Sequence, residues 1–189
     1  MKKKLMTLAG VLALSVTIVG CASSGGGTDD EKRAAIRESS ETILKKLYAA
    51  KPHAKKDMKS CYGYATFTNA NVNLIFVAAG GGYGMAAVKG GGKITYMNVG
   101  EGGLGLGLGA KDYDITMFFR TKDAYERFID SGWAFGANAD ATAKANEKGG
   151  SADGEVYSGD VKVYSLTSTG VAIQATVKGT KFWVDKHLN

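Results

Sequence analysis

The stretch GGGYGMAAVKGGGKITYMNVGEGGLGLGLG, residues 80–109, contains about half of the chain's 27 glycines. Its last part, GLGLGLG at 103–109, alternates strictly between glycine and leucine. A period of two is typical of a β-strand, so we expect Leu104, Leu106 and Leu108 on one face and bare glycines on the other. Glycine weakens a strand interior, so a glycine face is expected where another backbone, a helix or a ligand approaches closely. The rest of the chain should pack on this sheet or leave it exposed.

Further segments carry the apolar, aromatic and β-branched composition that is typical of strands. They lie on both sides of the glycine-rich stretch, at residues 60–69, 72–79, 93–99, 113–119, 156–166, 171–178 and 181–184. Alanine alternates with polar residues over 137–145, which predicts one more strand with a small-residue face. The segment EKGGSADG at 147–154 predicts a turn or an exposed loop.

Two segments have the capping signals of helices. In the first, residues 28–50, Thr28 and Glu31 have the spacing of a capping box, and Pro52 ends the helix. In the second, residues 121–130, Thr121 is the expected N-cap and Gly132 follows the last turn. The predicted fold class is therefore α+β: a mainly antiparallel, strongly curved or barrel-like glycine-rich β-sheet with an N-terminal helix and one internal helix.

The first 20 residues have the pattern of a secretory signal peptide, with a run of lysines at positions 2–4 and an apolar segment too short for a comfortable membrane span. Ile18, Val19 and Gly20 precede Cys21 as in a bacterial lipobox, so Cys21 is the predicted lipid anchor, modified by acyl chains such as palmitate. Ala22, rather than Asp, follows it, which favours the outer membrane, facing the periplasm. We expect a signal peptide at 1–20, a Ser/Gly tether at 21–28 and one domain at 29–189.

Charge and cysteine content exclude several classes of protein. The whole chain has a formal net charge of +6. Without the three lysines of the signal peptide, 21 basic and 18 acidic residues leave +3, which is no footprint of nucleic-acid binding but is compatible with an anionic membrane surface. With Cys21 used by the anchor, Cys61 has no disulfide partner and is expected in the core.

A basic run follows the apolar stripe of the first helix. It is the predicted lipid-binding surface and consists of Lys45, Lys46, Lys51, Lys55, Lys56 and Lys59. A charge run of this kind is commonly the solvated face of a helix that packs on a sheet. The alternative is a basic amphipathic element at the bilayer surface, which a short tether to the membrane favours.

The sequence contains no motif of a known catalytic or cofactor-binding site. Gly92 and Lys93 are followed by Ile94, so the phosphate-binding P-loop pattern fails. Residues 82–87, GYGMAA, match a dinucleotide-binding variant, but the glycines at 90–92 leave no room for the helix that this site needs. With two histidines and no HExxH, a zinc enzyme is not expected. We predict no cofactor, no metal and no enzymatic activity.

The order of several weak motifs resembles one known family. The glycine-rich centre, the YDITMFF strand with the helix after it, and the C-terminal segment YSLTSTGVAIQATVKGTKFWVDKHLN are similar to the SYLF domain. The resemblance covers about residues 40–189. It rests at the C-terminus on Tyr164, Ser165, Ser168, Gly170, Gly179, Thr180 and Asn189. It implies a lipid-binding module rather than an enzyme, and for a bacterial chain it implies acidic phospholipids rather than phosphoinositides.

Two functions follow as hypotheses. The first is a non-enzymatic envelope lipoprotein whose domain binds acidic phospholipid head groups at a membrane surface. The alternative is a structural or interaction lipoprotein that packs against another envelope protein. Neither hypothesis requires nucleic acid.

Overall fold

The computed structural model describes residues 27–75, 77–103, 107–135, 155–167, 170–171 and 179–189. These residues form three helices and nine strands. They are α1 (Asp29–Ala50), α2 (Ala54–Ser60), β1 (Gly63–Ile75), β2 (Val77–Val88), β3 (Ile94–Gly103), β4 (Gly107–Phe119), α3 (Lys122–Ser131), β5 (Trp133–Phe135), β6 (Glu155–Ser158), β7 (Val161–Thr167), β8 (Gly170–Val171) and β9 (Gly179–Val184).

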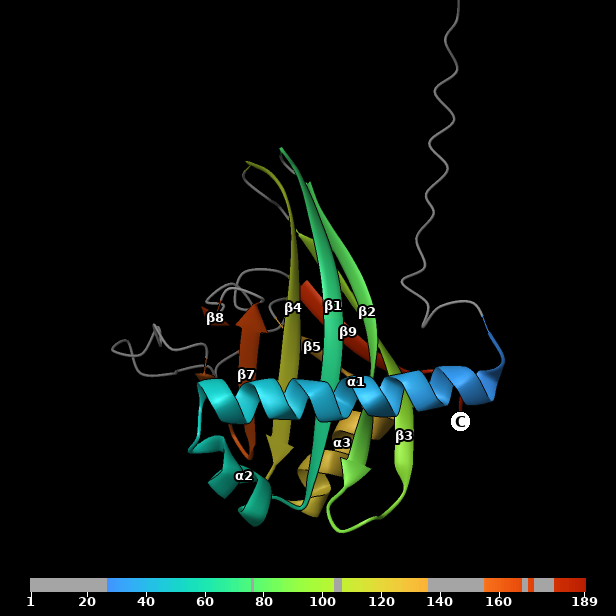
Figure 1. Cartoon of the computed structure of the whole chain (residues 1–189), viewed down its shortest axis with the longest axis vertical. Coiled ribbons are helices and arrows are strands. Elements are labelled where there is room, and N and C mark those ends of the chain that lie inside the picture. Colours follow the sequence, from blue (N-terminus) through green and yellow to red (C-terminus); the bar gives the residue numbers. More distant parts are fainter. Residues whose placement is uncertain (1–26, 76, 104–106, 136–154, 168–169, 172–178) are drawn as a thin grey trace, which may run out of the picture.

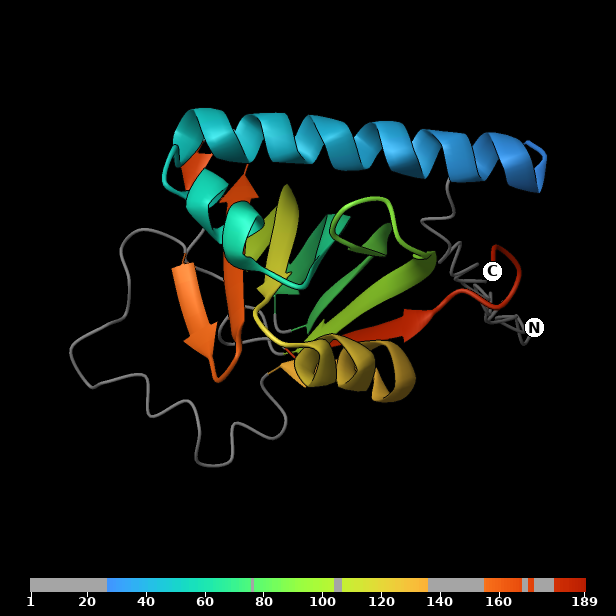
Figure 2. The same cartoon turned by 90° about the horizontal axis from the view of Figure 1, so that it is seen from below.

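All nine strands belong to one sheet, in the order β5-β9-β3-β2-β1-β4-β7-β6, with β8 paired to β7. Each pairing is antiparallel. The sheet bends into an arc, with α1 across its convex face and α3 on its concave side (Figures 1 and 2). The predicted α+β class with a curved antiparallel sheet is confirmed. A closed barrel is not, because β5 and β6 lie at opposite ends of the strand order.

Helix α1 packs one stripe onto the convex face. Its buried residues are Ile36, Ser40, Ile43 and Leu47, at the spacing that places them on one side of a helix. The hydroxyl of Thr66 in β1 donates a 2.7 Å hydrogen bond to Ser40, so the polar residue in this stripe is satisfied. The predicted capping box of α1 and its end before Pro52 are confirmed.

The larger core lies on the concave face, where α3 covers the middle strands. Aromatic rings dominate it. The ring centre of Phe67 in β1 lies 4.7 Å from that of Phe182 in β9, with the rings tilted, and the ring centre of Phe119 in β4 lies 4.9 Å from that of Phe128 in α3. Aromatic pairs at such distances stabilise beyond the area that they bury. The predicted N-cap Thr121 of α3 is confirmed, and Gly132 is its C-cap.

Glycines allow the sheet to bend sharply where β2 runs beside β1. A Cβ atom on Gly82 would lie 1.8 Å from the carbonyl oxygen of Thr68, and one on Gly84 would lie 2.0 Å from that of Thr66. Both positions admit only glycine without a backbone shift. The expected close approach of a backbone to a glycine face therefore occurs, but in β2.

The prediction of one strand over 103–109 is wrong. Gly103 ends β3 and Gly107–Gly109 begin β4, and these strands are separated by β2 and β1 in the sheet. Residues 104–106 lie outside the described part of the chain. An alternation with a period of two fits one continuous strand, and it fits equally well the end of one strand followed by the start of the next, because the backbone is extended in both cases.

Other predicted boundaries need correction. Strand β1 continues from Gly63 to Ile75, so it includes the first half of the predicted strand 72–79, and the rest of that segment, from Val77 on, begins β2. The predicted strand 156–166 is a hairpin of β6 and β7. Helix α2 was not predicted. The segments 137–145 and 147–154, most of 171–178 and residues 1–26 lie outside the described residues, so those predictions stay untested.

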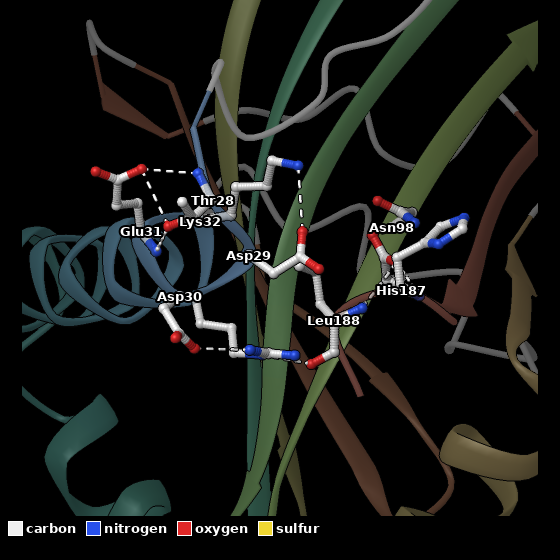
Figure 3. A network of polar contacts seen from close by, with 10 residues as sticks. Thr28, Asp29, Asp30, Glu31, Lys32, Asn98, His187 and Leu188 are labelled. Carbon is white, nitrogen blue, oxygen red and sulfur yellow. Dashed lines mark hydrogen bonds and ion pairs between the residues drawn. The ribbon is translucent and has the colours of Figure 1, made fainter.

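The start of α1 is tied to the C-terminal turn of the chain (Figure 3). The guanidinium group of Arg33 donates to the backbone oxygen of Leu188 at 2.9 Å and pairs with Asp30 at 2.8 Å. Asp185 accepts from the backbone of His187 and from the side chain of Asn98. These contacts hold the helix end that follows the predicted tether against the sheet.

Candidate functional site

Helix α2 presents three lysines on one exposed face. Lys55, Lys56 and Lys59 are all exposed. Lys59 follows Lys56 by three residues and Lys55 by four, the two spacings that make side chains neighbours on a helix. Ala54 on the opposite side is buried against the sheet. The side-chain amine of Lys55 lies 5.9 Å from the ring centre of Tyr48 in α1, a cation–π distance that leaves its charge toward solvent.

The turn between β2 and β3 brings two further lysines to the same end of the molecule (Figure 1). The side chain of Lys89 donates a 2.5 Å hydrogen bond to the backbone oxygen of Lys59, so the turn contacts the end of α2 directly. Lys93 is exposed at the other side of this turn. We call the set the lysine surface; its members are Lys55, Lys56, Lys59, Lys89 and Lys93.

Helix α2 is held by a polar contact with β7. The carboxylate of Asp57 accepts from the side-chain amine of Lys162 at 3.0 Å and from the hydroxyl of Tyr164 at 2.5 Å. Burial and the neighbouring carboxylate of Asp57 raise the pKa of Tyr164. Because Asp57 pairs inward with Lys162, it does not neutralise the outward lysines. Within the described residues no acid forms a salt bridge with the lysine surface.

The six predicted lysines separate into two groups. Lys55, Lys56 and Lys59 lie together on α2, whereas Lys46 on α1 forms an ion pair with Asp114 of β4 at 2.9 Å. Lys45 is exposed on α1, and Lys51 is the half-buried C-cap of that helix. Lys89 and Lys93 were not predicted as part of the surface. Only the hairpin and the docking of α2 bring them near Lys59.

The structure offers no reactive thiol at Cys61. The side chain is buried, it donates to the backbone oxygen of Met58 at 3.3 Å, and burial raises the pKa of the thiol. A nucleophilic cysteine needs a lowered pKa and access to solvent. Cys61 is therefore a core residue, as predicted.

Two classes of feature are not found in the described part of the chain. No group of three or more histidine, cysteine or acidic side chains is placed to hold a metal ion there. Of the helices described, none has both the length and the hydropathy of a membrane-spanning segment.

Comparison with known families gives one match over the second half of the chain. Residues 100–189 match the family model of Ysc84, described as a Las17-binding protein actin regulator. These residues are similar to a Ysc84-type domain. This match confirms the SYLF resemblance. It covers the strands from the end of β3 onward and α3, so the lysine surface precedes it.

A curated relative extends the likeness toward the N-terminus. Beta cell expansion factor A from Aeromonas veronii is 31% identical over 164 residues, which is 85% of this chain and 60% of the relative. A match of that extent includes α2 and the turn between β2 and β3. The chain thus spans about 60% of the length of this relative.

Proposed function

We propose that this protein is a non-enzymatic envelope lipoprotein whose Ysc84-type domain binds acidic phospholipid head groups through the lysine surface. The observation that carries the proposal is the grouping of five lysines at one end of the molecule. Lysines near an anionic membrane surface each contribute about 1 kcal/mol of attraction. The family match supports the proposal, because domains of the SYLF type bind lipid.

The position of α1 sets how the domain meets the bilayer. The proposed acyl anchor at Cys21 is joined to the helix at Thr28, and the lysines of α2 follow its other end. A helix of 22 residues is about 33 Å long. Both the anchor and the lysine surface reach the same leaflet only when α1 lies along the membrane. We propose this orientation at the periplasmic face of the outer membrane.

Neutralising the lysine surface should abolish most of the binding. Replacing Lys55, Lys56 and Lys59 by glutamine should weaken binding of residues 28–189 to anionic vesicles by roughly two orders of magnitude at low salt. Sedimentation with anionic and with neutral vesicles measures this. The matched control replaces Lys122, Lys181 and Lys186 by glutamine, which changes the net charge equally on parts of the surface away from α1 and α2.

The two variants distinguish an effect of the lysine surface from an effect of the net charge of the domain. If the control loses as much affinity as the α2 variant, the net charge rather than the lysine surface is responsible. If the parent domain sediments with neither type of vesicle, the lipid-binding proposal is wrong. Binding to both types without salt dependence would point to an apolar contact instead, because screening by salt acts only on charge.

The anchor makes a separate prediction. Replacing Cys21 by serine should leave a precursor that retains residues 1–20 and incorporates no fatty acid. Labelling cells with a radioactive fatty acid and comparing both proteins on a gel measures this. Continued labelling of the variant would contradict the lipobox interpretation, whatever the vesicle assay shows.

A second function is favoured by two observations. The description of the matching family names a protein partner, Las17. In addition, the side chain of Trp183 in β9 is 42% exposed, and it lies next to Gly100 of β3. Exposed tryptophan is enriched in protein interfaces. The alternative is therefore an interaction lipoprotein that packs against another envelope protein. Binding of the parent domain to neither vesicle type would favour it.

A further inference from the structure

The first two turns of helix α1 have little apolar surface of their own to bury. Residues 29–35 are charged residues followed by two alanines, and both alanines are exposed. Ile36 is the first residue of the helix that is buried. Among the hydrogen bonds of the described residues, only the one from Arg33 to the backbone oxygen of Leu188 joins these two turns to a segment outside α1 and its cap. The start of α1 therefore depends on the C-terminal turn, residues 185–189.

Leu188 supplies the apolar contact that these turns lack. Its side chain is 4% exposed and packs with Ile36 of the helix and with Met85 and Tyr96 of the sheet. The guanidinium group of Arg33 donates to the backbone oxygen of Leu188 at 2.9 Å. One residue of the C-terminal turn thus contacts α1 through its side chain and through its backbone (Figure 3).

Asn189 fixes the C-terminal turn to the sheet as a strand residue would. Strand β9 stops pairing with β3 at Val184, which lies opposite Met97. At the next residue of β3, Tyr96, the backbone N–H donates to Oδ1 of Asn189 at 3.0 Å, and the backbone oxygen accepts from Nδ2 of Asn189 at 2.8 Å. A carboxamide has the donor and the acceptor of a peptide group, so it can take the place of one in the ladder. None of the hydrogen bonds of Asn189 is made to α1.

We propose that the C-terminal turn is a latch: it holds the first two turns of α1 on the sheet, and its opening releases them while the rest of the helix stays bound. The division follows from the burial along α1. After Ile36 the helix has its own buried residues, Ser40, Ile43 and Leu47. Segments with few buried contacts open locally at a lower free energy than the core does.

The latch has a consequence for an anchored domain, because residues 29–35 directly follow the predicted tether. These seven residues span about 10 Å as a helix and up to about 23 Å when extended. An open latch lengthens the link between Cys21 and the sheet by up to about 13 Å and lets the lysine surface turn relative to the anchor. This consequence rests on the proposed function, whereas the latch itself does not.

Amide hydrogen exchange of the purified chain tests the latch at a distance. Asn189→Ala removes three hydrogen bonds of the C-terminal turn and no contact of α1. The amides of residues 33–39, which bond to the carbonyl groups of the first two turns, should exchange about tenfold faster than in the parent. The amides of residues 44–50 in the same helix should keep their rates. The matched control is Lys186→Gln, an exposed residue of the same turn, which should behave as the parent does over both segments.

A second variant cuts the latch from the side of the helix. Arg33→Met keeps the aliphatic part of the side chain but removes the hydrogen bond to Leu188. Exchange over residues 33–39 should again rise severalfold. The amide of Tyr96 should exchange as in the parent, because Asn189 still holds it, whereas in Asn189→Ala that amide should exchange faster.

The outcomes decide between a latch and a rigid end of the chain. Parent-like exchange over residues 33–39 in Asn189→Ala, or in Arg33→Met, overturns the proposal. Equal acceleration over residues 33–39 and 44–50 also overturns it, since α1 would then open as one unit. Exchange is measured without lipid, so failure of the latch and failure of the lipid-binding proposal are separate results.

Discussion

Replacing Gly84 by alanine should destabilise the domain by about 3 kcal/mol or more. The added Cβ atom would lie 2.0 Å from the carbonyl oxygen of Thr66 and 2.5 Å from a ring carbon of Phe67, so a backbone has to move. Overpacking a core commonly costs about 1–3 kcal/mol, and here the neighbour that must yield is a strand of the same sheet. For a chain of this size the melting temperature should fall by roughly 6–12 °C.

The matched control is Gly102→Ala in β3. This residue is also a strand glycine, but a Cβ atom there would meet no atom within 4 Å. Alanine should leave the melting temperature within about 2 °C of the parent, since surface substitutions commonly change stability by less than 0.5 kcal/mol. Thermal denaturation followed by circular dichroism measures both variants. Equal melting temperatures for Gly84→Ala and Gly102→Ala would show that close packing against β2 does not limit stability.

Local signals in the sequence predicted the elements but not their partners. The capping box and Pro52 predicted α1, the N-cap Thr121 predicted α3, and the β-rich run at 113–119 predicted the core of β4, because each depends on residues close together in the chain. The glycine face was predicted at 103–109, yet the tight approach occurs at Gly82 and Gly84. Which glycine a neighbouring strand approaches depends on sheet order and curvature, which a period of two does not contain.

The candidate site shows the same division. The lysines of α2 were recognisable as a basic run, but the helix itself was not predicted. It has seven residues, mostly charged, and too few apolar positions to show the period of a helix. Its place depends on Lys162, which is 105 residues from Asp57 along the chain. The approach of Lys89 to Lys59 depends on the hairpin between β2 and β3. Tertiary pairing of this kind leaves no local pattern in the sequence.

The contact between Asp57 and Lys162 makes the second large prediction. The side chain of Lys162 is 8% exposed, and the carboxylate of Asp57 lies 3.0 Å from its amine. Removing one partner of a buried ion pair costs about 3–5 kcal/mol, because a charge stays buried without the carboxylate that compensated it. Since the Asp57 side chain is 26% exposed, we expect Asp57→Ala to cost about 3 kcal/mol, at the lower end of that range.

Two further variants show whether the buried charge is the cause. The double variant Asp57→Ala with Lys162→Met removes both charges and should recover at least half of the stability that Asp57→Ala loses, because no ammonium group then stays buried at this position. Asp30→Ala breaks the exposed pair with Arg33 and should cost less than about 1 kcal/mol. Urea denaturation gives the free energy of unfolding of each protein. If the double variant is as unstable as Asp57→Ala alone, the loss comes from packing at α2 rather than from the charge of Lys162.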